Sequence, residues 1–328
     1  MIAVGTLEPA SWDPAAEDAA VLDVSRAARA AGARVTIDAP LGARTTLGIG
    51  GSARCLVEPA APSELAVVLA AVAQHDEAEV PMLVLGRGSN LLVGDLGWPG
   101  VVLQLGAGFK WQRRDGDEVR AGGGLAMPAL AAWAATEGLA GLEFAAGIPA
   151  SVGGSVRMNA GAHDGSTADF LVGVEVATTE TPDGVCLDPG RLGFGYRRSN
   201  LPARSVVISA RWRLRPDDPA DIRGRLDDLR AYRRRTQPLR QRNCGSVFTN
   251  PDGDSAGRII EDAGLKGLRR GGAQVSDKHA NFIVVEAAAR ATDVRALIGA
   301  LREAVVAAGG PLLEPEVRLV GRFEPGQR

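Results

Sequence analysis

The sequence predicts a protein of mixed helices and strands, folded into two or three domains. Its 328 residues are too many for a single small core, and its 45% share of hydrophobic residues is that of an ordinary globular protein. Segments with the apolar pattern of strands alternate along the chain with segments whose apolar residues recur every three to four positions, as in helices. Clusters of glycine separate many of these segments and mark turns at which the backbone can approach a ligand closely.

Charge and composition exclude several classes of protein. With 37 basic and 39 acidic residues the formal net charge is −2, which gives no general attraction to nucleic acid or to an anionic membrane. The three cysteines, Cys55, Cys186 and Cys244, and the three histidines are scattered, so we expect neither a disulfide framework nor a metal site. No leader pattern opens the chain, and no apolar run approaches the roughly 18 residues of a membrane span. We therefore expect a cytoplasmic protein.

Residues 1–38 are predicted to form an N-terminal extension. Pro9, Pro14 and the lack of any period indicate a flexible tail up to Glu17, and a short helix is expected over Ala19–Ala31. A glycine-rich segment then covers residues 41–59. The next helix begins at Pro62 and carries four apolar residues on one face, Leu65, Val68, Leu69 and Val72.

A candidate phosphate-binding turn follows the predicted strand Met82–Leu85, with the sequence Gly86-Arg87-Gly88-Ser89-Asn90. The third glycine of a dinucleotide-binding fingerprint is missing, and Leu91–Val93 is expected to be extended, so a Rossmann fold is excluded. Successive glycines can turn backbone N–H groups to one side and bind an anion, with Ser89 and Asn90 as further donors. A tight turn between two strands is the alternative for a lone Gly-X-Gly.

The middle of the chain is predicted to contain four strands and one helix. The strands are expected over Val101–Leu105, Glu118–Ala121, Val172–Ala177 and Val206–Leu214, and the helix begins at Pro128 and ends at Gly138. Residues 141–165 are so rich in glycine that they are predicted to be turns. Composition changes after Pro216, where we place a domain boundary.

The last third is predicted to be a smaller α+β unit. Helices are expected over Asp221–Arg235, over Ser255–Ala263, and from a cap at Thr292 to Gly309. Strands are expected near Ser246 and over Lys278–Val284. The dense run of arginines between Arg223 and Arg242 is either a solvated helix face or a cationic wall near a diphosphate.

Several of these motifs together resemble one enzyme family. Gly86–Asn90, Ile148–Gly154 and Cys244–Pro251 occur in the order of the motifs of UDP-N-acetylenolpyruvoylglucosamine reductase, and Tyr196-Arg197 and Glu314–Arg318 match two more. The resemblance implies an α+β fold of the vanillyl-alcohol-oxidase (PCMH) type. It implies an FAD-binding region over residues 39–216, made of two subdomains and joined by the C-terminal strand 312–328. A separate substrate-binding domain is implied over residues 217–311.

The same resemblance implies the roles of individual residues. FAD binding is implied for Gly50, Gly86, Gly88, Ser89, Asn90, Ile148, Ser151, Gly153, Gly154 and Asn159, and substrate binding for Tyr196, Asn250 and Arg234. Ser246 is implied to donate a proton, while Arg197 and Glu316 act on the substrate carboxylate. The chemistry agrees, because a guanidinium matches a carboxylate with two parallel N–H groups and a weak acid can quench a strongly basic carbon.

The implied reaction is the NADPH-dependent, FAD-mediated reduction of UDP-N-acetylglucosamine enolpyruvate to UDP-N-acetylmuramate, a step of peptidoglycan synthesis. The implied partner is this UDP-sugar, and we expect a monomer of the shorter subclass that lacks a tyrosine-bearing loop. Ala150, Thr249 and Val285 depart from the family pattern, so a divergent FAD-dependent oxidoreductase of specialised metabolism is an alternative. A flavin- or nucleotide-binding protein without turnover is a second alternative, although such a protein would not need Ser246.

Overall fold

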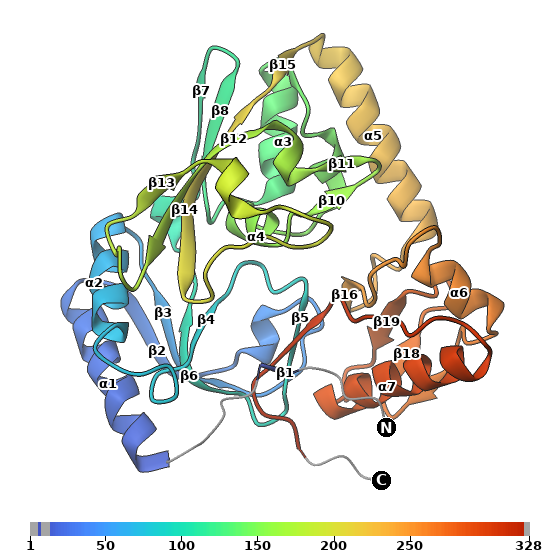
Figure 1. Ribbon diagram of the computed structural model, residues 1–328, viewed down its shortest axis with the longest axis horizontal. Coiled ribbons are helices and arrows are strands. Elements are labelled where there is room, and N and C mark those ends of the chain that lie inside the picture. The colour runs from blue at the N-terminus through green and yellow to red at the C-terminus, as the bar shows by residue number, and fades with distance from the viewer. Residues whose placement is uncertain (1–5, 8–13, 325–328) are drawn as a thin grey trace.

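The described chain, residues 6–7 and 14–324 of a computed structural model, folds into three groups of helices and strands. Figure 1 shows the N-terminal group at the lower left, the central group above it and the C-terminal group at the right, with the long helix α5 running from the central group toward the C-terminal one. Helices and sheets are mixed in all three, as the sequence predicted. Each group has its own cluster of buried apolar side chains.

The N-terminal group is a four-stranded sheet covered by two helices. The strand order is β2 (Arg34–Ala39), β3 (Ala53–Glu58), β6 (Trp98–Leu103) and β4 (Met82–Val84), with β3, β6 and β4 parallel. The helices are α1 (Pro14–Ala30) and α2 (Pro62–Val72). Leu65, Val68, Leu69 and Val72 of α2 are all buried, which confirms the predicted apolar face.

The central group is a five-stranded antiparallel sheet with helices packed against it. The order is β13 (Val185–Leu187), β12 (Leu171–Thr178), β14 (Ser205–Arg213), β8 (Glu118–Gly122) and β7 (Gln112–Asp115). It includes α3 (Met127–Thr136), α4 (Val152–Arg157) and α5 (Pro219–Thr236), and the pairs β9 (Leu139–Ala140) with β15 (Arg215–Pro216) and β10 (Gly161–Ala162) with β11 (Gly165–Ser166).

The C-terminal group is a four-stranded antiparallel sheet with two helices. The order is β16 (Asn243–Ser246), β19 (Phe282–Val285), β18 (Ala273–Val275) and β17 (Arg269–Arg270), and the helices are α6 (Ala256–Asp262) and α7 (Ala291–Ala307). Five short 3-10 helices are described: η1 (Gly42–Arg44), η2 (Ala107–Phe109), η3 (Glu143–Gly147), η4 (Thr167–Phe170) and η5 (Pro189–Leu192).

A small parallel sheet ties the end of the chain back to its beginning. Its strands are β1 (Thr6–Leu7), β20 (Arg318–Val320) and β5 (Leu91–Val93), with β20 in the middle. In Figure 1 the red strand β20 leaves the C-terminal group and lies beside β5. The family resemblance implied that the C-terminal strand joins the FAD-binding region, and in the structure β20 pairs with β5.

Four local predictions were wrong. The strand predicted over Lys278–Val284 begins only at Phe282, as β19. The first helix begins at Pro14 instead of Ala19, because proline is well suited to the first turn of a helix. Pro14–Glu17 and Thr6–Leu7 therefore do not belong to a tail, whereas residues 8–13 lie outside the described part. Residues 152–157 form α4 rather than a turn. Finally, α7 begins at Ala291, and the carboxylate of Asp95, not a cap at Thr292, accepts the N–H groups of Ala291 and Thr292 at 2.7 and 2.9 Å.

Candidate active site

The candidate site is a cavity of about 700 Å³ that all three groups line. The N-terminal group contributes the turn Gly86–Asn90, and the central group contributes Ile148–Ser151 and Arg197. Cys244–Ser246 and Glu316 line it from the C-terminal part of the chain. A second cavity of about 570 Å³ shares Gly86, Arg87, Ser151, Gly154 and Arg157 with the first, so the two adjoin along the glycine-rich segments.

Glycine is required in the first glycine-rich turn for packing and for backbone conformation. Gly88 has φ +62°, and a Cβ there would lie 2.6 Å from the carbonyl oxygen of Arg44 and 2.7 Å from Cα of Thr45. A Cβ on Gly86 would lie 2.6 Å from Oγ of Ser151, which belongs to the second glycine-rich segment. The two segments therefore touch each other, and the turn can carry no side chains at these two positions without movement of its neighbours.

The second glycine-rich segment leads into α4. Ser151 caps this helix, because its Oγ accepts the N–H of Gly154 at 3.2 Å. Five described non-glycine residues have positive φ, and Ala150 is not one of them. The methyl group of Ala150, where the family usually has glycine, is therefore compatible with the backbone.

Ser246 stands at the end of β16 and faces the first cavity. Backbone pairing with Phe282 of β19 fixes the strand, and Gly245 just before it has φ +78°. The side chain is half-buried, and within the described chain its hydroxyl makes no hydrogen bond. The hydroxyl is thus available to a ligand in the cavity.

Glu316 is held from two sides by backbone contacts. Its N–H donates to the carbonyl oxygen of Val247 at 2.8 Å, next to Ser246, and its own carbonyl oxygen accepts Nδ2 of Asn90 at 3.0 Å. These bonds bring the serine strand, the first glycine-rich turn and Glu316 together at one point. The positions of Ser246 and Glu316 are therefore coupled by backbone and not only by side chains.

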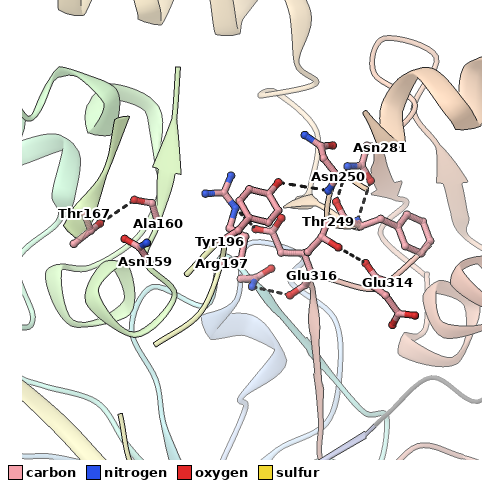
Figure 2. A network of polar contacts seen from close by, with 12 residues as sticks. Asn159, Ala160, Thr167, Tyr196, Arg197, Thr249, Asn250, Asn281, Glu314 and Glu316 are labelled. Carbon is pink, nitrogen blue, oxygen red and sulfur yellow. Dashed lines mark hydrogen bonds and ion pairs between the residues drawn. The ribbon is translucent and has the colours of Figure 1, made fainter. Parts of the chain in front are cut away.

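Arg197 and Glu316 form an ion pair at the cavity wall, with Nε of Arg197 3.1 Å from Oε1 of Glu316. Figure 2 shows this pair between Asn159 on one side and Thr249 and Asn250 on the other. Burial raises the pKa of Glu316 above its ordinary value, and the charge of Arg197 partly opposes that shift. Nε of Arg197 is buried and has no well-aligned hydrogen-bond acceptor among the described residues. The pair can therefore reorganise around an incoming carboxylate.

Five of the predicted site residues lie outside the residues that line the two cavities. Gly50 has φ +109°, and a Cβ on it would collide with the backbone of Val93. Tyr196 is 56% exposed to solvent. Asn250 accepts the N–H of Ala256 with its side chain and so helps to begin α6. The side chain of Asn159 bonds to Gly195 and Ala168, and the backbone carbonyl of Arg234 accepts Nζ of Lys278. The remaining predicted site residues all line one cavity or both.

Several basic residues of the site were not among the predicted site residues, although the arginine run that contains Arg233 was considered as a cationic wall near a diphosphate. Arg87, Arg157, Arg233 and Arg318 line the first cavity together with Arg197, while only Glu77 and Glu316 are acidic. Burial lowers the pKa of Arg157 and of Arg233, as expected for cations held away from water. Arg157 donates to Ser205 and to the carbonyl oxygen of Pro202, which fixes it without a carboxylate. The sequence signals were an arginine between two glycines and another just before Met158-Asn159.

These features fit a flavin dinucleotide. A Cβ on either Gly86 or Gly88 would collide with neighbouring atoms of the protein. The lining of the first cavity contains five arginines and two acidic residues. The two adjoining cavities together offer an elongated space. Desolvated cations and glycine-rich backbone suit a diphosphate, and apolar side chains such as Ile148, Leu83 and Val84 suit a flat ring. Among the described residues no cluster of His, Cys, Asp or Glu could hold a metal ion. The described helices also include none long and apolar enough to cross a membrane.

Comparison with known proteins assigns the class first. Residues 53–186 match the family described as FAD binding domain, which includes both glycine-rich segments that line the cavities. The predicted α+β FAD-binding fold is thereby confirmed, and the chain is a flavin-dependent oxidoreductase.

The family follows from the rest of the chain. Residues 237–320 match UDP-N-acetylenolpyruvoylglucosamine reductase, C-terminal domain. The reductase of Anaeromyxobacter sp. (strain Fw109-5) is 47% identical over 287 residues, 87% of this chain and 88% of its own length. That of Granulibacter bethesdensis is 42% identical over 88% of this chain and 91% of its own. The crystal structure of the enzyme from Thermus caldophilus has a TM-score of 0.75 at 39% identity, covering 88% of this chain and 99% of that one. The chain belongs to the UDP-N-acetylenolpyruvoylglucosamine reductase family.

Proposed function

We propose that this protein reduces UDP-N-acetylglucosamine enolpyruvate to UDP-N-acetylmuramate with NADPH and FAD. The observation that carries the proposal is the meeting of Ser246, Arg197 and Glu316 at one cavity, beside the glycine-rich segments that suit FAD. The three residues come from separate parts of the chain, and backbone bonds hold two of them in place. Residues 237–320 match the C-terminal domain of this family, and a reductase of the family is 47% identical over 87% of the chain. Both findings favour this reaction over a changed substrate on the same scaffold.

Bound FAD would supply the redox chemistry, the transfer of hydride from NADPH to the terminal carbon of the enolpyruvyl double bond. In our proposal Gly86, Gly88, Ser89 and Asn90 hold the diphosphate on one side, and Ser151 with Gly153 and Gly154 on the other. Ile148, which lines the first cavity, would lie against the ring. The desolvated guanidinium of Arg157, between the two cavities, adds positive charge for the diphosphate. These residues set the position of the cofactor relative to Ser246.

Ser246 would supply the proton that completes the reduction. Hydride addition leaves a strongly basic carbon next to the substrate carboxylate, and the unpaired Oγ of Ser246 would donate its proton to that carbon. The serine oxygen would then take a proton back from solvent. Because the carbon is so basic, the hydroxyl needs to be well placed more than it needs to be acidic.

Arg197 and Glu316 would act on the carboxylate side of the same group. The Arg197 guanidinium can donate two parallel N–H groups to the carboxylate and stabilise the negative charge that spreads onto it. Glu316 lies against that guanidinium, and its raised pKa favours taking up a proton when a second carboxylate arrives. A protonated Glu316 would remove the repulsion between the two carboxyl groups.

Two of the three departures from the family pattern, Thr249 and Ala150, have ordinary structural surroundings. Oγ1 and N–H of Thr249 both donate to the carbonyl oxygen of Glu314, so this position is held within the protein, and Ala150 has no unfavourable φ. We keep in the proposal that Tyr196, Asn250 and Arg234 contact the substrate, with Arg233 as the neighbour that lines the cavity. Gly50 remains predicted to act at the flavin side.

The wider predictions also belong to this proposal. We propose that residues 39–216 and the strand region 312–328 form the FAD-binding part, and that residues 217–311 form the substrate domain. A cytoplasmic monomer is proposed, consistent with three cysteines that are all free. Size-exclusion chromatography with light scattering would check the oligomeric state.

The decisive experiment is a two-step anaerobic titration. NADPH should bleach the flavin absorbance of the purified protein, and UDP-N-acetylglucosamine enolpyruvate should restore it with formation of UDP-N-acetylmuramate. UDP-N-acetylglucosamine, which lacks the enolpyruvyl group, is the matched control and should leave the flavin reduced. If the enolpyruvyl compound also left it reduced, the proposed reaction would be wrong, while bleaching alone would still leave a flavin reductase.

A further inference from the structure

Asn159 was predicted to bind the cofactor, but its side chain is used within the protein. Nδ2 donates to the carbonyl oxygen of Gly195 at 3.1 Å, and Oδ1 accepts the N–H of Ala168 at 3.0 Å. The residue has φ +39°, a conformation that asparagine tolerates better than most residues. It lines neither cavity. Both polar groups of the Asn159 side chain are therefore hydrogen-bonded within the protein, and Nδ2 is bonded to the segment that carries Arg197.

Gly195 opens a tight turn in which Arg197 is strained. The N–H of Arg198 donates to the carbonyl oxygen of Gly195 at 3.2 Å, and the N–H of Gly195 donates back to Arg198 at 3.1 Å. Between them Arg197 has φ +57°, which is unfavourable for a residue with a Cβ. Such a conformation persists only where the surroundings enforce it. The carbonyl that closes this turn is the one that Asn159 holds.

The far side of the turn is anchored to the serine segment. The hydroxyl of Tyr196 accepts the N–H of Asn250 at 3.4 Å, and the Arg197 guanidinium lies 5.1 Å from the centre of the Tyr196 ring. Figure 2 shows the turn between Asn159 on one side and Asn250 on the other. Of these two anchors, the bond from Asn159 is the shorter one.

We propose that Asn159 is a positioning residue for the substrate carboxylate: it holds the Gly195–Arg198 turn so that Arg197 points into the cavity. This inference rests on the proposed function, in which Arg197 binds that carboxylate. It replaces the predicted role of Asn159 at the flavin with one at the substrate. Removal of the Nδ2 donor leaves the carbonyl oxygen of Gly195 bonded only within the turn, to the N–H of Arg198. The strained turn can then relax and move the guanidinium away from the carboxylate. FAD, which Asn159 does not touch in this scheme, stays bound.

The test is Asn159→Asp, a nearly isosteric change. Aspartate still accepts the N–H of Ala168 and tolerates positive φ, but it cannot donate to Gly195 and places a carboxylate oxygen against that carbonyl. Two ligands are titrated into the oxidised holoenzyme without NADPH, so that no turnover occurs. They are the enolpyruvyl substrate and UDP-N-acetylglucosamine, which lacks the carboxylate.

We expect the affinity for the enolpyruvyl substrate to fall about tenfold, because part of a charged hydrogen-bond pair is lost. The affinity for UDP-N-acetylglucosamine should stay within about twofold by the same arithmetic. FAD content and the rate of flavin reduction by NADPH should match those of the unmodified protein. Loss of FAD would return Asn159 to the cofactor side and overturn the proposal, as would equal weakening of both ligands or no change in either.

Three further variants make the result specific. Thr167→Val removes a hydroxyl that donates to the carbonyl oxygen of Ala160, beside Asn159, but leaves Gly195 untouched, so it should alter neither affinity. Asn159→Gly suits the positive φ, also removes the bond to Gly195 and carries the same test if the aspartate variant does not fold. Arg197→Lys should lower the enolpyruvyl affinity selectively. If it does not, the carboxylate clamp of the proposed function is wrong; if it does and Asn159→Asp does not, only the positioning role is wrong.

Discussion

Replacement of Ser246 by alanine should separate the two halves of the reaction. The hydroxyl makes no hydrogen bond within the described chain, and the pairing of β16 with β19 uses backbone groups, so the fold does not depend on it. A change at such a position is worth at most about 0.5 kcal/mol of stability. The midpoint of thermal unfolding should therefore shift by no more than about 2 °C.

The effect on chemistry should be much larger. A positioned general acid contributes about 10²–10⁴-fold, which corresponds to about 2.7–5.4 kcal/mol of activation free energy. Only the half-reaction in which the enolpyruvyl substrate takes up hydride and a proton needs this acid. Reduction of the flavin by NADPH should therefore keep its rate, while reoxidation by the enolpyruvyl substrate should slow by that factor.

Anaerobic stopped-flow spectroscopy of the flavin band measures both steps in one sample. Ser246→Thr is the companion variant, since it keeps a hydroxyl and adds one methyl group; it should retain more reoxidation activity than Ser246→Ala. Equal slowing of reduction and reoxidation in Ser246→Ala would refute the reasoning, because a missing proton donor cannot affect transfer from NADPH to flavin. Unchanged reoxidation would refute it as well.

Three other predictions follow from the same geometry. Arg197→Lys keeps the charge but loses the planar pair of donors, so reoxidation should slow at least tenfold with normal FAD content; near-normal turnover would move the carboxylate clamp elsewhere, with Arg198 first. Because burial raises the pKa of Glu316, binding of the enolpyruvyl substrate should take up protons, and the affinity should weaken as the pH rises above that pKa. Calorimetry in buffers of different ionisation enthalpy measures this proton uptake. The uptake should vanish in Glu316→Gln. Gly88→Ala should lose FAD and stability, because its Cβ would lie 2.6 Å from the carbonyl oxygen of Arg44. The control is Gly116→Ala, with φ +57° and no atom within 4 Å of its Cβ, which should only cost about 1–2 kcal/mol of backbone strain. Equal effects of the two variants would show that the turn at Gly88 does not meet the cofactor.

Much of the fold could be predicted because the signals are local. The apolar face of α2 and the glycine that ends α6, Gly264 with φ +71°, follow from periodicity and backbone preference alone. Helix α4 could not be predicted in this way, since Gly153 and Gly154 are poor helix formers. Its stability comes from the Ser151 cap and from packing against β14, which only the folded chain supplies.

The site was predicted unevenly for a similar reason. Gly88, Ser246 and Glu316 lie in short sequence motifs that are typical of the family, so the resemblance could predict them as site residues. On α5, the side chain that lines the cavity is that of Arg233 and not Arg234, and neighbouring residues on a helix differ in direction by about 100°. That helix buries only Ile222 and Leu226 among its described residues, too few to fix its orientation from sequence.

The pairing of β20 with β5 also determines at what stage of synthesis the active site can be assembled. Asn90 and Glu316 are 226 positions apart, and their bond closes the cavity wall. Until the ribosome has delivered β20, β5 lacks its neighbour and the serine strand lacks Glu316. During that period β5 lacks the strand that pairs with it, and an unpaired strand edge is the kind of surface on which chains aggregate. A chain cut short before Glu316 would remain in that state, with its flavin-binding segments made but its active site never assembled.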